Sequence, residues 1–297
     1  MHVISASRRM DLPAFQLPAF LDALRRGWID VPHPFSAKVE RVALSGPDVA
    51  GIVFWTRRPA ALLPHLAALR RAYDGRLRVQ ATLTGLPRAL EPRAPEADET
   101  VAALSALSRE LGPEALSWRL DPLVLSEGTP TAWWRETFTR LAARLEGQVG
   151  EVVVSWLDLY ARSRRNLLPV EQAGFRLSNP TPAGRAELLE ELVVIGARHS
   201  LRLAACCEPE MLVRSGLRPA ACLDAAWFEA RGGLLPGSLG SQPSRAGCGC
   251  CRARDIGVYN SCAFGCRYCY ANRTPRLEAP TDPWRALAAL RSVAMGP

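Results

Sequence analysis

The sequence predicts an α/β protein built on a partial, six-unit TIM-like barrel, with a cysteine-rich C-terminal segment covering the mouth. Three observations predict it. Short apolar runs alternate six times with helical runs, proline or glycine bounds each helical run, and a Gly/Ser/Pro connector precedes the cysteines. Strands separated by helices form parallel sheets with right-handed crossovers. Six units are too few for a full eight-fold barrel, and an open doubly wound sheet is the alternative.

Six runs have the length and the apolar, β-branched or aromatic character of buried parallel strands. These runs are 2–5, 51–55, 77–83, 115–120, 151–157 and 201–207. Between them, proline in a first turn and glycine after a last turn mark the ends of helices. The predicted helices run from Pro18 to Gly27, from Pro59 to Asp74, from Glu96 to Leu111, from Pro130 to Glu146, from Pro182 to His199 and, broken, from Glu208 to Gly232.

Composition divides the chain into three parts. Residues 1–231 are expected to form the barrel, 232–247 a linker, and 248–297 a cysteine-rich iron–sulfur segment. A final helix should begin at Asp282, run to about Met295 and pack back on the barrel.

The 297 residues are 48% apolar, which is enough for a sizeable core. No segment approaches the roughly 20 apolar residues of a membrane span, and the N-terminus turns charged too early for a secretory signal. We therefore expect a cytoplasmic protein with no membrane partner. Nine cysteines then indicate metal ligation before disulfides, and six of them lie between Cys248 and Cys269. The net charge of +8 rests almost wholly on arginine and reflects composition as much as a polyanion-binding surface.

The segment YNSCAFGCRYCYANR spaces Cys262, Cys266 and Cys269 as C-x3-C-x2-C, with Tyr268 before the third cysteine. Structural zinc usually takes four N or S ligands in two short pairs. Three closely spaced thiolates instead suit three irons of a cubane and leave the fourth iron open to a small molecule. We therefore favour an iron–sulfur cluster over zinc.

This motif resembles the signature of the radical S-adenosylmethionine superfamily, whose members also use a partial six-unit barrel. The resemblance implies a [4Fe–4S] cluster whose open iron chelates S-adenosylmethionine, and an external electron donor that starts its cleavage. Two segments depart from the superfamily pattern. SRRMD (7–11) stands where the cysteine loop normally follows the first strand, and FWTRRP (54–59) replaces the Gly-Gly-Glu-type segment after the second.

The whole chain resembles a bacterial family described only as a domain of unknown function, noted for a C-terminal cysteine cluster like that motif. The similar segments are ISASRRMDLPAF (4–15), IVFWTRRP (52–59), TLTG (82–85), WRLDP (118–122), SWLDLY (155–160), ACLD (221–224) and CGCCRARDIGVYNSCAFGCRYCYAN (248–272).

The family pattern implies a further set of four cysteines: Cys206, Cys222, Cys248 and Cys250. Four thiolates make a complete site, so the resemblance implies a second metal centre, either zinc or an auxiliary iron–sulfur cluster. The alternative for Cys206 and Cys222 is that they are small buried apolar residues, as free cysteines often are. Cys207 and Cys251 are spare or substitute ligands.

The ends of parallel strands converge on one mouth, so the polar residues that follow the predicted strands are site candidates. Those assigned to catalysis are Arg8, Arg9, Asp11, Arg119 and Asp158. Those assigned to cofactor binding are Thr56, Thr82, Thr84 and Ser155. Arginine forks suit carboxylates and phosphates, so we expect an anionic small molecule or nucleotide there. Arg119 lies within a strand and needs a partner, either Asp121 or Asp11.

These features predict an iron–sulfur protein, a radical S-adenosylmethionine-like enzyme acting on an anionic small molecule or nucleotide. The alternative is a nucleic-acid processing or binding protein with a structural metal site in its cysteine tail. In that case Trp55 and Tyr160 would stack on bases within a basic rim. A pure electron-transfer protein would leave the barrel mouth unexplained.

Overall fold

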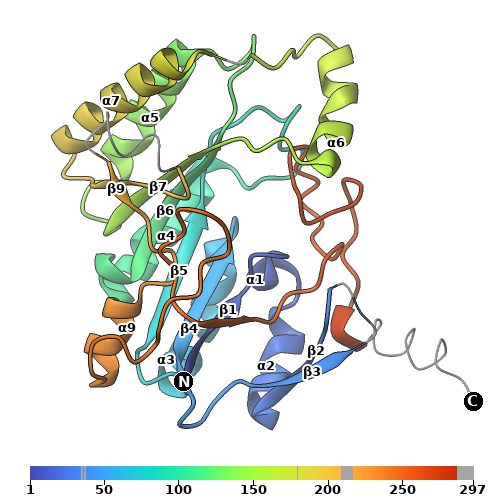
Figure 1. Ribbon diagram of the computed structural model, residues 1–297, viewed down its shortest axis with the longest axis vertical. Helices are drawn as coiled ribbons and strands as arrows, with labels where there is room; N and C mark the ends of the chain where they lie inside the picture. Colours follow the sequence, from blue (N-terminus) through green and yellow to red (C-terminus); the bar gives the residue numbers. More distant parts are fainter. Residues whose placement is uncertain (35, 37, 179, 209–216, 286–297) are drawn as a thin grey trace, which may run out of the picture.

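The computed structural model describes residues 1–34, 36, 38–178, 180–208 and 217–285 (Figure 1). In that part of the chain, one all-parallel sheet of eight strands has the order β10-β1-β4-β5-β6-β7-β8-β9. The strands are β1 (His2–Ala6), β4 (Val49–Thr56), β5 (Leu77–Thr82), β6 (Leu116–Leu123), β7 (Glu151–Trp156), β8 (Leu203–Ala205), β9 (Arg218–Pro219) and β10 (Ala253–Asp255). All six predicted strands are among them. The alternation of strands with helices confirms the predicted α/β fold, a partial, open TIM-like barrel.

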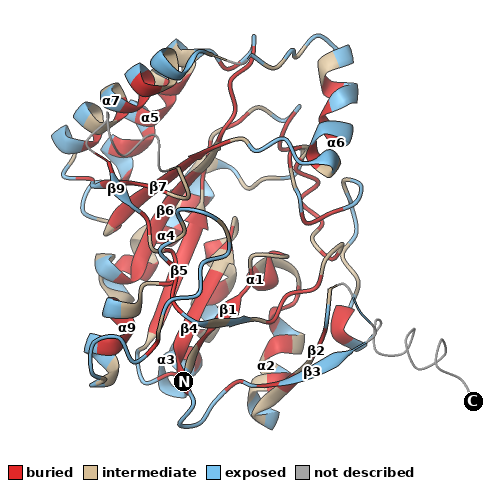
Figure 2. Ribbon diagram, in the orientation of Figure 1, coloured by how far each residue is buried: buried red, intermediate tan, exposed pale blue. Residues whose placement is uncertain are grey.

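Helices follow the strands and cover the sheet. They are α1 (Leu12–Phe15), α2 (Leu17–Arg26), the 3-10 helix η1 (Pro59–His65) with α3 (Leu66–Ala72), α4 (Ala97–Leu111), α5 (Thr131–Leu145), α7 (Pro182–Arg198) and α9 (Ala225–Gly232). α4 buries Thr100, Ala103, Leu104 and Leu107, which recur on one helical face. Figure 2 shows the same division on α5 and α7, with red faces toward the sheet and blue faces outward. Among the helices that the structure describes, none has the length and apolarity that a membrane crossing needs.

The sheet is curled, because strands that are distant in the sheet order contribute to one buried cluster. Val3 on β1 shares that cluster with Val153 on β7 and Ala204 on β8. In a flat sheet β1 and β8 would lie five strand spacings, about 24 Å, apart. The Gln80 side-chain amide on β5 also donates to the carbonyl oxygen of Cys222, which follows β9, at 3.2 Å. Strands from both halves of the sheet therefore face a common interior.

Three parts of the structure differ from the predicted elements. An antiparallel hairpin of β2 (Trp28–Pro32) and β3 (Val39–Ala43) lies between α2 and β4, and α6 (Ala161–Gln172) follows β7. In place of one broken helix after β8, the described residues form β9 and α9. Part of that predicted helix (209–216) and most of the predicted C-terminal helix (286–297) lie outside the described residues.

The unpredicted elements have weak sequence signals for identifiable reasons. β3 reads VERVA, and all of its side chains but Val42 are exposed, so no buried apolar run marks it. α6 reads ARSRRNLLPVEQ, which is rich in arginine and contains Pro169, a residue that normally ends a helix. Both elements lie at the periphery, where apolar periodicity carries little information.

The cysteine-rich segment begins inside the sheet. β10 (Ala253–Asp255) pairs in parallel with β1, and Ser5 lies opposite Asp255. Gly257 follows, and a Cβ atom there would lie 1.8 Å from Ser7 Oγ, so only glycine permits this approach of the two chains. The added edge strand delivers the last cysteines to the strand ends, where Figure 1 shows the red loop beside α1 and α6.

Candidate functional site

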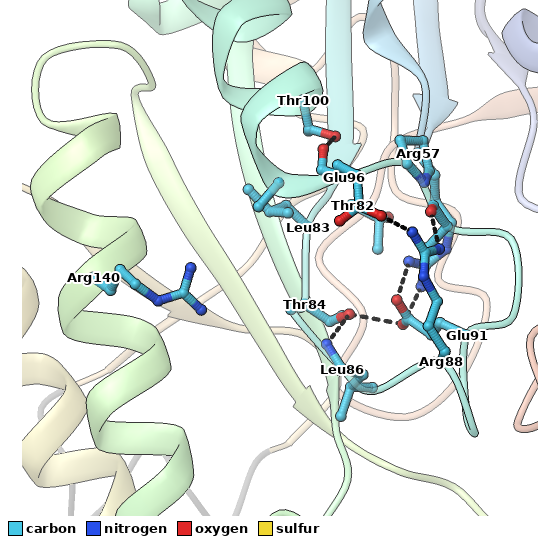
Figure 3. Close-up of a pocket in the computed structure, with 14 residues that line it drawn as sticks. Arg57, Thr82, Leu83, Thr84, Leu86, Arg88, Glu91, Glu96, Thr100 and Arg140 are labelled. Atoms are coloured by element: carbon cyan, nitrogen blue, oxygen red, sulfur yellow. Dashed lines mark hydrogen bonds and ion pairs between the residues drawn. The ribbon is translucent and has the colours of Figure 1, made fainter.

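A cavity of about 770 Å³ lies at the carboxyl ends of the strands. Its wall contains the predicted residues Arg8, Arg9, Asp11, Thr56, Thr82, Arg119, Ser155 and Asp158 together with Cys206, Cys222, Cys248, Cys250, Cys262, Cys266 and Cys269. Thr84 instead lines a smaller neighbouring cavity of about 200 Å³ (Figure 3). Arg57 and Thr82 line both cavities. The tertiary structure therefore brings both predicted cysteine sets and the strand-end arginines to one cavity.

The first cysteine set, Cys262, Cys266 and Cys269, occupies one loop after β10. This loop is packed into the main core, since Cys266 is only 9% exposed and Phe264 only 1%. The Phe264 ring meets the edge of Phe15 on α1, with ring centroids 4.8 Å apart. Apolar packing therefore holds the loop against the barrel, and the thiols of the loop line the cavity.

The thiols of the first set are protonated in the metal-free protein. Burial raises the pKa of Cys262 and of Cys269, and it raises the pKa of Cys266 to about 12 although the Arg57 guanidinium opposes the shift. The Ala271 N–H donates to Cys269 Sγ at 3.3 Å, a bond that stabilises a ligating thiolate. Metal binding must release the thiol protons, so affinity should rise with pH.

A buried ion pair anchors the first set to the barrel. Arg57, directly after β4, donates through both Nη atoms to the Glu91 carboxylate at 2.8 Å each (Figure 3). Glu91 also accepts from the Thr84 hydroxyl at 2.7 Å and from the Tyr268 hydroxyl. Tyr268 is the aromatic residue of the cysteine motif, so this network ties the motif directly to the strand ends.

Asp11 joins the loop after β1 to the end of β4. Its carboxylate caps α1 by accepting from the Ala14 N–H at 3.0 Å, and it accepts from the Thr56 hydroxyl at 2.7 Å and the Arg57 N–H at 2.6 Å. Burial raises the pKa of Asp11 to about 6, although these hydrogen bonds lower it. Asp11 and Thr56 therefore position the cavity wall for each other.

Asp255, at the end of β10, organises the loop after β1. Its carboxylate accepts from the Ser5 hydroxyl at 2.8 Å, the Ser7 hydroxyl at 2.9 Å and the Arg8 N–H at 2.9 Å. The guanidinium groups of Arg8 and Arg9 each approach the same carboxylate to 3.8 Å. One carboxylate thus holds two arginines side by side on the cavity wall.

Arg8 and Arg9 keep guanidinium donors available to a ligand. Among the described residues, the Arg8 guanidinium donates no hydrogen bond; it approaches the Asp255 carboxylate to 3.8 Å and lies 5.9 Å from the centroid of the Trp55 ring. The Arg9 guanidinium makes one long hydrogen bond, 3.5 Å to the Gly257 carbonyl oxygen, and lies 5.5 Å from the Tyr259 ring. These two arginines are suited to a planar anion such as a carboxylate or phosphate.

Arg119 is engaged differently. From β6 it donates to Asp121, to Gln80 Oε1 at 3.4 Å and to Cys222 Sγ at 3.0 Å. Asp121, one of its two expected partners, is in turn hydrogen-bonded by the Ser155 hydroxyl. Arg119 therefore supports a cysteine sulfur and a carboxylate rather than presenting a free fork to the cavity.

Asp158 lies at the open edge of the cavity, where its side chain is 45% exposed. It pairs with Arg245 of the predicted linker and accepts from the Tyr160 hydroxyl at 3.3 Å. Arg245 also donates to the Cys206 carbonyl oxygen at 3.4 Å. A linker residue thus connects the end of β8 with the loop after β7.

The second cysteine set comes from three separate segments. Cys206 ends β8, Cys222 follows β9, and Cys248 and Cys250 precede β10. The Sγ atoms of Cys206 and Cys222 are 3.9 Å apart, and the Cys250 thiol lies near enough to the thiols of Cys222 and Cys248 to interact with both electrostatically. Cys207 Sγ lies 3.9 Å from Cys206 Sγ. The four predicted sulfurs therefore form a continuous row.

The chemistry of these donors fits bound metal. All nine cysteines are free thiols, so no disulfide competes for them. In the described part of the chain, no group of three or more His, Cys, Asp or Glu side chains is placed so that it could hold a single metal ion. A cubane contacts each cysteine through a different iron, so its ligands are spread more widely. The first set fits a cluster in ligand type, number and access to the cavity.

Several residues that shape the two cavities were not predicted from the sequence: Glu91, Arg245, Asp255, Tyr259 and Tyr270. Glu91 and Arg245 stand in stretches without apolar periodicity, so nothing local marks them. Asp255 ends a three-residue strand, and its position after a short run resembles that of Asp158 after β7. That strand-end position was the one usable signal.

The fold and the cavity define a parallel α/β protein with a cysteine-rich site at the carboxyl ends of its strands. Residues 3–271 match the family described as Domain of unknown function (DUF1848), and the chain belongs to that family. The match spans both cysteine sets and confirms the resemblance to a family of unknown function. Comparisons with curated proteins and with solved structures find no match.

Proposed function

We propose that this protein is an iron–sulfur enzyme of the radical S-adenosylmethionine kind, acting on an anionic small molecule or nucleotide. One observation carries the proposal: the C-x3-C-x2-C thiols line the same cavity as Arg8 and Arg9, whose donors remain available. A metal-binding loop with a purely structural role has no need to share a cavity with two arginines whose pairing with Asp255 is loose, at 3.8 Å each.

The proposed ligands are Cys262, Cys266 and Cys269, which would hold a [4Fe–4S] cluster. Such a reduced cluster supplies the electron that splits S-adenosylmethionine into methionine and a 5′-deoxyadenosyl radical, so an external electron donor is required. The protein would bind, orient and shield the reactants. Packing of the loop through Phe264 and Tyr268 buries Cys266 and leaves Cys262 and Cys269 partly exposed, which limits the access of water to the sulfurs.

Charge in the cavity supports an anionic ligand. Five arginines and four aspartates line it, which leaves a small positive excess. Arg57 and Arg119 direct their forks at Glu91 and Asp121, whereas Arg8 and Arg9 approach Asp255 only to 3.8 Å. We therefore assign ligand binding to Arg8 and Arg9, and positioning roles to Asp11, Thr56, Arg119 and Ser155.

The test is anaerobic reconstitution with iron and sulfide, reduction with dithionite, and measurement of 5′-deoxyadenosine from added S-adenosylmethionine. The wild type should form it, and Cys266→Ala should not. Cys251→Ala is the matched control, because Cys251 is equally buried but does not line the cavity. Product from the wild type no greater than from Cys266→Ala would reject the proposal. An EPR spectrum of the cluster unchanged by S-adenosylmethionine would also count against it.

A further inference from the structure

The two edges of the curled sheet meet at the second cysteine set. β9 and β10 are the first and last strands in the sheet order, and neither has a second strand neighbour in the described residues. The Cys251 N–H donates to the Leu223 carbonyl oxygen at 3.0 Å and joins the segments beside these edges. A Cβ on Gly249 would lie 3.2 Å from the Ala220 carbonyl oxygen, so the two segments are in close contact. Figure 1 shows the orange chain after α9 passing in front of the sheet before β10 runs beside β1.

Four thiols line this seam in a continuous row. Cys206 contacts Cys222 at 3.9 Å between Sγ atoms, and Cys248 and Cys250 line the same cavity, where Cys250 interacts electrostatically with the thiols of Cys222 and Cys248. Zinc–sulfur bonds of about 2.3 Å in a tetrahedron place sulfurs about 3.8 Å apart, so the Cys206–Cys222 pair already has the spacing of one tetrahedral edge.

A buried cation accompanies the row. Arg119 Nη1 lies 3.0 Å from Cys222 Sγ, and the Arg119 side chain is 9% exposed. Its other Nη atom donates to Asp121, which compensates the charge on that side, whereas a neutral thiol gives the guanidinium little stabilisation on the side of Cys222. Four thiolates around a divalent ion, or around a cubane, carry net negative charge, which a guanidinium at hydrogen-bond distance stabilises. The contact is therefore a feature expected beside bound metal.

We propose that Cys206, Cys222, Cys248 and Cys250 bind a four-thiolate metal centre, zinc or [4Fe–4S], that fastens the two edges of the barrel together. Arg119 is its positioning residue. The centre has no residue in common with the proposed cluster on Cys262, Cys266 and Cys269. It therefore stands or fails independently of the proposed enzymatic function.

The experiment removes the first set and asks whether metal remains. The chain carrying Cys262→Ser, Cys266→Ser and Cys269→Ser is purified anaerobically and analysed for zinc, iron and sulfide. It should retain about one zinc, or about four irons with four sulfides, per chain. Either composition supports the centre and identifies its metal. A metal-free triple variant that keeps the far-ultraviolet dichroism of the wild type would overturn it.

Two further variants locate the metal. Adding Cys222→Ser and Cys250→Ser to that background should lower its metal content at least ten-fold. Adding Cys251→Ser should leave the content unchanged, since Cys251 lies next to Cys250, is equally buried and does not line the cavity. Equal metal in the two proteins would overturn the assignment.

Alkylation of the wild type provides a test that does not depend on folding of the variants. In the metal-loaded protein Cys222 and Cys250 should resist N-ethylmaleimide, and they should react at least ten-fold faster once EDTA and ferricyanide have removed the metal. Cys207 lines the same cavity outside the proposed ligand set and should react in both samples. Labelling of Cys222 and Cys250 that is indifferent to metal removal would contradict the proposal.

Discussion

The two cysteine sets line one cavity but are built in opposite ways. Cys262, Cys266 and Cys269 lie within eight residues of one loop, which packs into the main core through Phe264. The second set draws on the ends of β8, β9 and the approach to β10, and belongs to a separate buried cluster inside the sheet. We call the first set (Cys262, Cys266 and Cys269) the loop set and the second set (Cys206, Cys222, Cys248 and Cys250) the seam set. Local chain geometry brings the loop set together, whereas the seam set comes together only when the two edges of the curled sheet meet.

Because of this difference, metal binding at the two sets should contribute differently to the free energy of unfolding. Ligands on one short loop stay near each other in the unfolded chain, so metal binding there restricts little. Ligands from distant segments are far apart in the unfolded chain, and a metal that joins them removes much unfolded-state entropy. Four predictions use this contrast, from the largest expected effect to the smallest.

Removing the seam ligands should cost more stability than removing the loop ligands. Cys206 to Cys222 spans 16 residues and Cys222 to Cys248 spans 26. Closing two such loops contributes about 6 kcal/mol by chain entropy, and the short spacings of the loop set about half that. Urea unfolding of metal-loaded Cys222→Ser/Cys250→Ser should show the larger loss, compared with the triple serine variant of the loop set. Equal losses in the two would break the comparison.

Glu91→Gln should destabilise the loop set while sparing the seam. Removing one partner of the buried Arg57–Glu91 pair leaves an uncompensated charge and costs about 4 kcal/mol. Urea unfolding should show this loss, and native-state labelling should expose Cys266. Glu96→Gln is the control, because its pair with Arg88 is exposed on both sides and contributes less than about 1 kcal/mol. A Glu91→Gln protein as stable as this control would refute a buried anchor.

Arg119→Lys should weaken metal binding at the seam alone. Lysine cannot reproduce a fork that reaches Asp121, Gln80 and Cys222 together, and loss of such a supporting contact typically costs about 10–100-fold in metal affinity. Competition with a chelator measures the change. Arg109→Lys, near the end of α4, supplies a matched control. Equal weakening at the loop set would show that Arg119 acts on the whole cavity.

Tyr270→Phe should have the smallest effect. It removes the hydrogen bond from the Tyr270 hydroxyl to the Arg8 carbonyl oxygen at 2.6 Å, a loss of about 1 kcal/mol in unfolding free energy. Metal content at both sets should be unchanged, because among the described residues that hydroxyl donates to the Arg8 carbonyl oxygen and makes no hydrogen bond with a cysteine. Loss of iron from this variant would show that the contact between the loops, and not the thiols alone, maintains the loop set.

Much of the barrel could be predicted because its strands are short apolar runs and its helices begin and end at proline or glycine. GIVFW of β4 and EVVVSWL of β7 are buried on both faces of the sheet, and their nearly continuous apolar residues predict this burial directly. The hairpin of β2 and β3 could not be predicted in this way. β3 is largely exposed, and although Ile29 and Val31 of β2 and Val42 of β3 reach the core, the pairing of the two strands is set by the antiparallel register and not by a buried apolar run.

The candidate site was predictable where chemistry is local. The spacing of Cys262, Cys266 and Cys269 is itself the ligand pattern, and Arg8 and Asp11 follow a recognisable strand. Glu91 and Asp255 escaped prediction because each acts through partners from other strands. Asp255 meets Ser5 and Ser7 only after β10 has paired with β1.

The sequence by itself determined the alternating elements, the parallel sheet and the cysteine loop, since each depends on residue types within a few positions of one another. Only the tertiary structure decided that β10 joins β1, that Arg119 contacts Cys222 and Asp121, and that the thiols of Cys206, Cys222 and Cys250 meet. Those contacts depend on how the sheet curls. Curling is a collective consequence of twist and packing over the whole chain, and no short stretch of residues encodes it.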